Sequence, residues 1–534
     1  MRGRVPISVS APMGESVWLR EARAFTRGAV ATPHYLASAA GARVLATGGN
    51  AVDAAVAANL VLGVVVPYMC GFGGDLMAMV WDGAVRAYRG AGRAPAAATS
   101  AKIRDLSETR TMPVLGPHTV TVPGAVEGWF ALLDEWGTRS FGDLAADALR
   151  YADEGFVPTR RGAWFFESVA GAYDASGLPD FRTAYGTVAA GVPIRQPALG
   201  GLIRTLADEG PDPFYRGRIG EAIAARVAAA GGLLATDDLA AHRGEWVAPL
   251  HARFRDLEVF EHPPPTQGMT ALGALRIIDG LDPGSDGPDR QHLLIEALRI
   301  ALSDRATHLG DPGAMTVDPT DFLAEEAVAA RRRSIDPRRT TVPAPAPAPD
   351  GGTVYLCAAD GDGLMVSLIQ SNFFAAGSGL RVPEWGVNLY NRGSGFVLED
   401  GHPHAIGPRK YPLHTLIPAL ALRDGAPGFV FGTEGAHGQA QTHVQLLTRI
   451  AVDRSDPQAA ISAPRFTIDP GSGEVAIEDH MDEAWIADLE RRGHRIRRVP
   501  AYRHGPGIAH LIEKTVSGLR AASDPRAEGG VAGW

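Results

Sequence analysis

The chain contains 534 residues, of which 45% are hydrophobic and 21% charged, the composition of a globular protein with enough apolar material for a large core. A formal net charge of -9 gives no overall basic field, so we expect neither nucleic acid nor an anionic membrane as a partner. No stretch approaches the ~18 consecutive apolar residues of a membrane-spanning helix.

Cysteine usage and the N-terminus favour a cytoplasmic protein. The two cysteines, Cys70 and Cys357, lie within apolar runs. They are interpreted as small buried side chains in a reducing compartment, without a disulfide framework or a metal site. Residues 1–12 lack the continuous apolar segment of a secretion signal.

Apolar periodicity, helix caps and turn residues predict two blocks of helices and hairpin strands. Residues 100–300 are interpreted mainly as helices joined by irregular segments. The predicted elements in chain order are strand 28–31, helices 34–47 and 51–65, strands 76–81 and 84–88, helices 141–154, 219–230 and 290–306, strands 354–359, 364–370, 416–422 and 428–432, helix 439–452, and strands 474–477 and 519–522. Such blocks fit a layered α+β fold with antiparallel sheets between helices.

The glycine-rich turn at 71–75 is a candidate phosphate loop by composition alone. It follows a helix and enters a strand, which is the reverse of a nucleotide-binding loop, and it has no Gly-Lys-Ser/Thr. Close packing of the backbone is therefore the better interpretation.

Thr353 stands where an extended linker meets a buried hairpin. Residues 343–349 alternate proline and alanine, which favours an extended, solvated segment. Cleavage of the Gly352–Thr353 bond would give Thr353 a free amine beside its own hydroxyl at the edge of a sheet, as an N-terminal threonine nucleophile requires. Gly352 also minimises the steric obstacle to an N-to-O acyl shift. Taken alone, however, a threonine here is most often an ordinary strand residue.

Two further segments have both a chemical and a structural interpretation. The turn at 432–436 connects a strand to a helix, so its amides are able to form an oxyanion hole, although such a turn is more often only a tight connection. His402 and His404 have a spacing compatible with metal binding, but the surrounding Gly, Pro and Ala predict an exposed loop. Neither a zinc motif nor a Gly-x-Ser-x-Gly elbow occurs, and we expect no metal or organic cofactor.

Many ordered motifs together resemble one family. They include Gly48-Gly-Asn-Ala-Val-Asp53, Gly71-x-Gly73-Gly74, the Thr353 strand and Pro412-x-His414-Thr415. Other matching segments are 120–129, 214–217, 296–298, 304–305, 371–372, 377–379, 391–393, 463–466 and 523–526. The chain resembles γ-glutamyltransferases (γ-glutamyltranspeptidases), autoprocessed threonine N-terminal-nucleophile hydrolases. The resemblance implies an αββα sandwich in which a large portion, 1–352, and a small portion, 353–534, together form one unit.

The resemblance also implies roles for individual residues. Thr353 is expected to be the processing and catalytic nucleophile, Gly435 and Ala436 the oxyanion-binding pair, and Asn372 a residue that positions the substrate or the nucleophile. The substrate pocket is expected to be lined from a set that departs in part from the family pattern: Arg89, Arg93, Asn391, Arg392, His414, Thr415 and Glu434.

Three departures suggest a changed substrate. Neither Arg89 nor Arg93 falls in the register of the family's carboxylate-clamping arginine, and Gly395 replaces its amine-binding aspartate. His414-Thr415 replaces a Ser-Ser pair. Each lost charge-assisted contact is worth about 1.5–3 kcal/mol, so affinity for a free glutamyl group should fall while the chemistry persists. The pattern looks like a non-classical, cytoplasmic branch of the family.

The sequence thus predicts hydrolysis or transfer of a γ-glutamyl or related acyl amide through an acyl-enzyme, with a small-molecule substrate. One alternative keeps the machinery but hydrolyses a carbon–carbon bond in alkylproline-type antibiotic biosynthesis. A second alternative is an unprocessed scaffold or binding protein. The partners implied are the self-derived large and small portions, and the sequence leaves open whether processed heterodimers associate into homo-oligomers.

Overall fold

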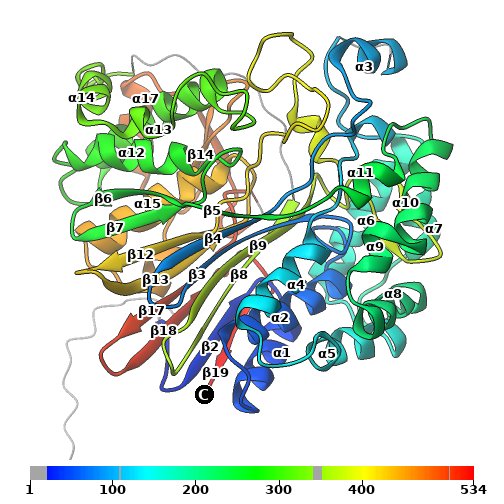
Figure 1. The fold of residues 1–534 in the computed structure, drawn as a ribbon. Helices are drawn as coiled ribbons and strands as arrows, with labels where there is room; N and C mark the ends of the chain where they lie inside the picture. The colour runs from blue at the N-terminus through cyan, green and yellow to red at the C-terminus, as the bar shows by residue number, and fades with distance from the viewer. Residues whose placement is uncertain (1–20, 108–109, 341–351, 504) are drawn as a thin grey trace, which may run out of the picture.

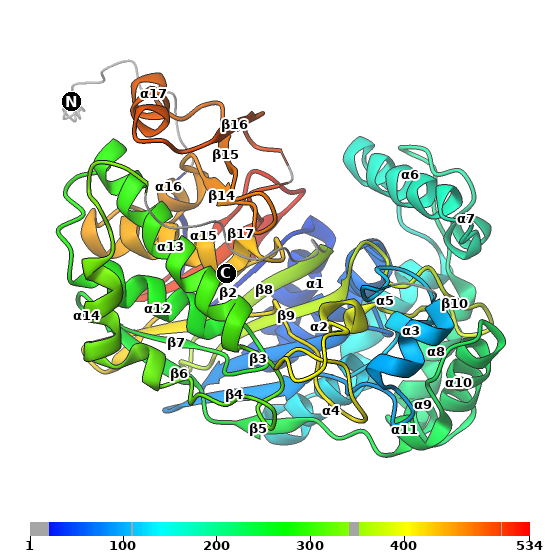
Figure 2. The same cartoon turned by 90° about the horizontal axis from the view of Figure 1, so that it is seen from above.

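Two seven-stranded antiparallel sheets, packed face to face, form the centre of the molecule. The computed structural model describes residues 21–107, 110–340, 352–503 and 505–534 (Figure 1). A group of helices covers the outer face of each sheet, and Figure 2 shows the layers from above. The predicted αββα sandwich is confirmed. The predicted linker segment 343–349 and residues 1–12 lie outside the described residues.

Both sheets take strands from each side of the Gly352–Thr353 bond. The first has the order β19-β2-β8-β9-β3-β4-β5, with bounds Gly530–Gly533, Gly28–Thr32, Gly352–Asp360, Met365–Phe373, Asp75–Trp81, Val85–Gly90 and Glu245–Val247. The second has the order β1-β18-β17-β13-β12-β7-β6, with bounds Arg23–Phe25, Gly518–Ser523, Ala509–Thr515, Ala426–Thr433, Ala419–Arg423, Leu257–Glu261 and Leu250–Phe254.

Strand alternation assigns the side chains to the layers. On β8, Leu356 and Ala358 pack toward the first helical layer, whereas Tyr355 and Cys357 lie between the sheets. Both Cys70 and Cys357 are free and buried, as expected from the sequence. A shift of one residue would exchange these two sets of side chains, so the buried pattern fixes the register.

The first helical layer includes α2, every residue of which is buried, in agreement with its apolar sequence. Helices on this side are α1 (Tyr35–Ala46), α2 (Ala51–Val65), α4 (Ala125–Trp136), α5 (Phe141–Asp153), α6 (Arg160–Ala175), α8 (Pro197–Glu209) and α10 (Arg218–Ala229). Shorter helices are α3 (Ser100–Ser107), α7 (Asp180–Tyr185), α9 (Asp212–Arg216) and α11 (Thr236–Ala240).

The second helical layer packs on β12, β13 and β17. Its helices are α12 (Gly268–Asp279), α13 (Pro288–His308), α14 (Glu325–Arg333), α15 (Gly438–Val452), α16 (Pro457–Ser462) and α17 (Glu483–Arg491). Two small sheets complete the described part, one of β10 (Arg381–Val382) and β11 (Val387–Asn388), the other of β14 (Phe466–Ile468), β15 (Val475–Glu478) and β16 (Ile496–Val499). Single 3-10 turns are η1 (Pro117–Thr119), η2 (Asp321–Leu323) and η3 (Arg392–Gly395).

The predicted helices and strands occur within a few residues of their expected bounds, but one prediction is wrong. The interval 245–261, expected to be irregular, contains β5, β6 and β7. β5 and β6 are sheet-edge strands with partly exposed, charged residues, so their apolar pattern is weak. Among the described residues, none of the helices has both the length and the apolar character needed to cross a bilayer.

The two sheets pack tightly against each other where Gly432 of β13 meets Tyr355 of β8. A Cβ at Gly432 would lie 2.4 Å from Cε2 of the Tyr355 ring. We expect Gly432→Ala to lower the free energy of unfolding by about 1–3 kcal/mol through overpacking, measured as the midpoint of urea unfolding. Gly273→Ala in α12 is the control, because nothing lies within 4 Å of its added Cβ. Equal stability of the two variants would contradict this packing.

Candidate active site

Thr353 is the second residue of β8, and its hydroxyl is buried in a short hydrogen-bond chain. Thr353 Oγ1 donates to Ser371 Oγ at 3.1 Å, and Ser371 Oγ donates to the carbonyl oxygen of Gly352 at 2.6 Å. The backbone N–H of Phe373 donates to the same Ser371 Oγ at 2.7 Å. The Thr353 hydroxyl and the carbonyl that precedes Thr353 are therefore joined through one serine.

The sheet ladder is irregular at this point. The register between β8 and β9 shifts between Gly352 and Val354. β8 is an interior strand, not the edge strand expected from the sequence, but its pairing with β2 covers only Cys357 to Asp360. Thr353 thus lies at the end of an interior strand, beyond the reach of β2.

The turn after β13 joins that strand to α15, as predicted. Gly435 and Ala436 both have positive φ, 117° and 46°, a conformation that costs an L-alanine free energy. Gln267 Nε2 donates to the carbonyl oxygens of Ala436 and Thr415, at 2.8 and 2.9 Å. This amide holds the strained turn against the neighbouring loop, a role that no sequence pattern around Gln267 predicts.

The course of β13 relates this turn to Thr353. Ser367, which pairs with Cys357, donates to the carbonyl of Phe431, and the next residue, Gly432, contacts Tyr355. β13 therefore advances along β8 toward its Thr353 end. The turn at 435–436 continues in that direction.

A cavity of ≈ 140 Å³ lies at this end of the sandwich. Phe373, which follows Ser371 and Asn372, lines it together with His437, which follows Ala436. Arg392 and Thr415 also line it. The cavity wall therefore includes a residue two positions after Ser371 and a residue directly after the 435–436 turn.

Arg392 is fully buried in this cavity wall, at the start of η3. Its guanidinium lies 3.8 Å from the centroid of the Phe373 ring, and its Nη1 donates to Thr415 Oγ1 at 3.3 Å. Burial lowers the pKa of Arg392 to about 10, so the side chain stays protonated near neutral pH. Stacking on an aromatic face is a common way to hold a buried guanidinium.

Asp75, at the end of the glycine-rich turn, is a buried carboxyl that the sequence analysis did not single out. Its Oδ2 lies 2.7 Å from Nε2 of His414, and its Oδ1 accepts the N–H groups of Gly92 and Gly124, each at 3.1 Å. Burial raises the pKa of Asp75 to about 8, against the attraction of Arg392. Burial, followed by the charge of Arg392, holds the pKa of His414 well below its usual value, so the imidazole is neutral. The available signal was a carboxylate placed directly before a buried strand.

Arg89 and Arg93 lie beside Glu245 and do not line the cavity that contains Arg392. Arg89 Nη1 donates to the carbonyl of Pro264 at 2.7 Å, and Arg93 Nη2 donates to Glu245 Oε1 at 2.9 Å. Both guanidinium groups lie over the Tyr411 ring. Both guanidinium groups are thus bonded to protein groups, although Arg89 Nε has no hydrogen-bond partner among the described residues.

The asparagines and Glu434 are all buried. The Asn372 side chain lies against the glycine-rich turn, since a Cβ at Gly74 would meet its Oδ1 at 2.7 Å. Asn391 supports the loop after β9, with its Oδ1 accepting the N–H of Phe374 at 3.0 Å and its Nδ2 donating to a carbonyl at 2.8 Å. The backbone N–H of Glu434 donates to the carbonyl of Ile508 at 3.1 Å.

The prediction that His402 and His404 lie in an exposed loop is wrong for His404. His404 is buried and lines the cavity together with His402, which is half-buried. The segment folds against Lys410, whose ammonium donates to the carbonyls of Pro403 and Ala405 at 3.2 and 2.8 Å. Gly and Pro here make a compact loop over the cavity wall.

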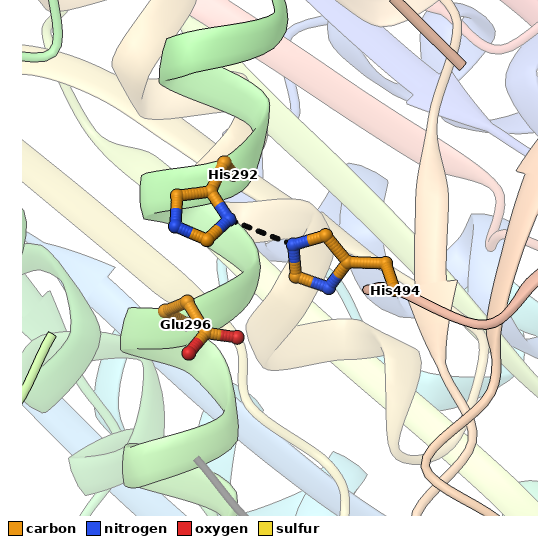
Figure 3. A group of neighbouring side chains, drawn as sticks. All are labelled: His292, Glu296 and His494. Carbon is orange, nitrogen blue, oxygen red and sulfur yellow. Dashed lines mark hydrogen bonds between the residues drawn. The ribbon is translucent and has the colours of Figure 1, made fainter. Parts of the chain in front are cut away.

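Among the described residues, one group has a composition suitable for a metal: His292 and Glu296 of α13 with His494 (Figure 3). His292 Nε2 contacts the carbonyl of Asp336 at 2.8 Å, which requires the proton there and leaves Nδ1 to accept from His494 Nε2 at 2.7 Å. Two nitrogens bound tetrahedrally to zinc at about 2.0–2.1 Å lie more than 3 Å apart. The geometry is that of a hydrogen-bonded pair which fastens Asp336 to α13.

Comparison with known proteins shows the family to which the chain belongs. The family model Gamma-glutamyltranspeptidase matches residues 37–534. The chain is 34% identical over 525 residues to the glutathione hydrolase-like YwrD proenzyme of Bacillus subtilis (strain 168), covering 95% of this chain and 98% of the relative. It is 34% identical over 529 residues to the oxamate amidohydrolase proenzyme of Klebsiella pneumoniae, covering 95% and 99%. The crystal structure of cephalosporin acylase from Bacillus halodurans matches with a TM-score of 0.92 and 32% identity over 99% of each chain.

The αββα sandwich, shared with this acylase, defines the protein as an N-terminal-nucleophile hydrolase. Within that class, the chain belongs to the γ-glutamyltranspeptidase family, whose model covers nearly its full length. The resemblance stated from sequence motifs is confirmed.

The raised pKa of Asp75 has a consequence for stability. The pKa of the folded carboxyl is about 8, against the ordinary 3.8, so between these pH values it keeps a proton that the unfolded chain releases. The contribution of Asp75 to the free energy of unfolding therefore becomes less favourable as pH rises from about 4 to 8. We expect Asp75→Asn to gain stability relative to wild type between pH 5 and pH 8, measured by urea unfolding at both values.

The control for loss of one carboxylate is Asp105→Asn, at an exposed position in α3. A stability difference between Asp75→Asn and wild type that shrinks or stays constant with rising pH would contradict a buried, protonated Asp75.

Proposed function

We propose that this protein is an autoprocessing threonine amidohydrolase or acyltransferase, with Thr353 as nucleophile. The observation that carries the proposal is the Thr353–Ser371–Gly352 hydrogen-bond chain. It supplies an attacking hydroxyl, a proton relay and a polarised carbonyl within three residues.

These contacts support the following course of self-cleavage. Thr353 Oγ attacks the carbonyl carbon of Gly352, its proton passes to Ser371 Oγ, and the Ser371 proton passes to the carbonyl oxygen. The C–N bond then breaks as the Thr353 nitrogen takes up a proton, leaving an ester that water hydrolyses. The products are a chain ending at Gly352 and a chain beginning with Thr353.

The new N-terminus then acts on the substrate. A free α-amine has a pKa of about 7.7–8.0, which makes it a usable base for the adjacent hydroxyl near neutral pH. Thr353 Oγ attacks the substrate carbonyl while the amides of Gly435 and Ala436 stabilise the oxyanion. The amine of the substrate leaves with a proton, and water or another amine releases the acyl group from Thr353.

The relatives support amide chemistry and leave the acyl group open. Their names refer to glutathione, oxamate and cephalosporin, as hydrolases, amidohydrolases or acylases. A shared machinery with changing acyl groups fits this range better than carbon–carbon bond cleavage, and membership of a hydrolase family favours an enzyme over a scaffold.

Processing is tested by denaturing gel electrophoresis with N-terminal sequencing. We expect the wild type to separate into 1–352 and 353–534, with Thr353 as the new N-terminus, and Thr353→Ala to remain a single intact chain without amidase activity. Thr340→Ala, in the last described stretch before the linker, serves as the control and should still be cleaved. An intact wild-type chain would favour the scaffold alternative.

The relay predicts a specific role for Ser371 in positioning and proton transfer. We expect Ser371→Ala to slow cleavage about 100-fold, because the Gly352 carbonyl loses its hydroxyl donor. Ser371→Thr, which keeps the hydroxyl, should process faster than Ser371→Ala. Cleavage is followed on gels as a time course after refolding. Equal rates for the alanine variant and the wild type would remove Ser371 from the mechanism.

A further inference from the structure

Another cavity, of ≈ 360 Å³, lies beside β5 and shares no wall residue with the cavity that contains Arg392. Its wall comes from segments that are far apart in the sequence: the residues after β4, the end of α11 with the residues that follow it, and the loop that contains Arg409. The charged residues of the wall are Arg93, Arg243 and Arg409, with Asp238 and Glu245.

The two carboxylates of this wall are already bonded to protein groups. Asp238 accepts two backbone N–H groups, one on each oxygen, at 2.8 and 3.0 Å. Glu245 is paired with Arg89, which balances its charge. Its Oε1 also accepts from Arg93 Nη2 and from the Tyr411 hydroxyl, each at 2.9 Å. The positive charge of the wall therefore exceeds its negative charge.

The arginines are held near one another by the backbone. Arg93 Nη1 donates to the carbonyl of Arg409 at 3.2 Å, and Arg243 Nη1 donates to the carbonyl of His242. Arg409 has a φ of 56°, a left-handed conformation that costs a non-glycine residue free energy. Gathering three like charges around one cavity is unfavourable unless an anion lies between them.

His242 supplies a buried polar group to the same wall. The residue is only 7% exposed, and its ring stacks on Tyr215 with the ring centroids 5.1 Å apart. Its Nε2 has no hydrogen-bond partner among the described residues. Burial, followed by the charges of Arg243 and Arg93, lowers the pKa of His242 to about 3, so the ring is neutral and has one N–H to donate. A buried nitrogen without a partner is costly, which favours a ligand at this position.

The arrangement of these donors suits a phosphate group better than a carboxylate. A carboxylate has two oxygens and one charge, which the fork of a single arginine can match. Guanidinium groups from three segments, with a neutral N–H beside them, match an anion of higher charge that has three terminal oxygens. The volume of ≈ 360 Å³ equals about twelve water molecules at about 30 Å³ each, so there is room for more than the phosphate group itself.

We propose that this cavity is a second ligand site, which binds the phosphate group of a small phosphorylated molecule. His242 donates to the phosphate through Nε2, and Arg243 and Arg409 bind its oxygens. Arg93 adds positive charge while it remains paired with Glu245. The proposal does not rest on the proposed function, because the reaction at Thr353 uses none of these residues.

The test is calorimetric titration of the full-length wild type with inorganic phosphate in a buffer of low ionic strength. Phosphate should bind saturably, and acetate should bind at least about tenfold more weakly, because it has one charge and two oxygens. Arg243→Ala and Arg409→Ala should each weaken phosphate binding by about fivefold or more through loss of a charge-assisted contact. Arg338→Ala removes an exposed arginine elsewhere, in the segment before the linker, and should leave binding unchanged.

His242→Phe tests the buried donor separately. Phenylalanine keeps an aromatic ring against Tyr215 but has no N–H, so phosphate binding should weaken by about fivefold, the typical value of one hydrogen bond. Circular dichroism and the urea unfolding midpoint establish whether this variant is folded. If it is not, the two variants of exposed arginines decide the question.

Three results would overturn the phosphate site. They are absence of saturable phosphate binding, binding that Arg243→Ala and Arg409→Ala leave unchanged, and an equal loss in Arg338→Ala, which would indicate a non-specific effect of charge. Acetate binding as tight as that of phosphate would also reject the assignment to phosphate. An unprocessed wild type that binds phosphate through Arg243 would contradict the proposed function and leave this site intact.

Discussion

The close contact of the two sheets at Gly432 and Tyr355 sets the geometry of the site. Because Gly432 has no side chain, the Tyr355 ring packs directly on the β13 backbone. That contact, with the hydrogen bond from Ser367 to Phe431, fixes how far β13 advances along β8. The position of the 435–436 turn relative to Thr353 follows from this alignment. A loop placed by packed strands needs no flexible adjustment of its own.

The local part of this arrangement was predictable from the sequence. The hairpin of β8 and β9 has continuous apolar strands and an Asp-Gly turn, and Thr353 was identified because it follows two glycines after a proline-rich segment. The turn at 432–436 was also recognised as a connection between strand and helix. These features depend on neighbours in sequence, which is where periodicity and turn chemistry are informative.

The non-local part was not predictable. Gln267 joins two loops that lie more than a hundred residues further along the chain, and nothing around it distinguishes it from an ordinary helix-capping amide. β6 and β7 were missed because charged residues interrupt their apolar pattern. The partners of Arg89 likewise could not be known, since Glu245 and Pro264 come from a region interpreted as irregular. In each case the sequence pattern does not show which distant segment of the chain packs against the residue or strand in question.

The interleaving of strands from before and after the Gly352–Thr353 bond has a consequence for any nicked form of the protein. Neither 1–352 nor 353–534 contains all the strands of either sheet. Each portion would therefore expose an unpaired apolar surface if it separated from the other. The broken chain should therefore stay together as tightly as an intact one, held by the shared core rather than by a docking interface. Refolding after complete denaturation differs, because two separate chains must then associate. The yield of refolded protein therefore depends on concentration for the cleaved form, whereas refolding of the single-chain precursor is unimolecular.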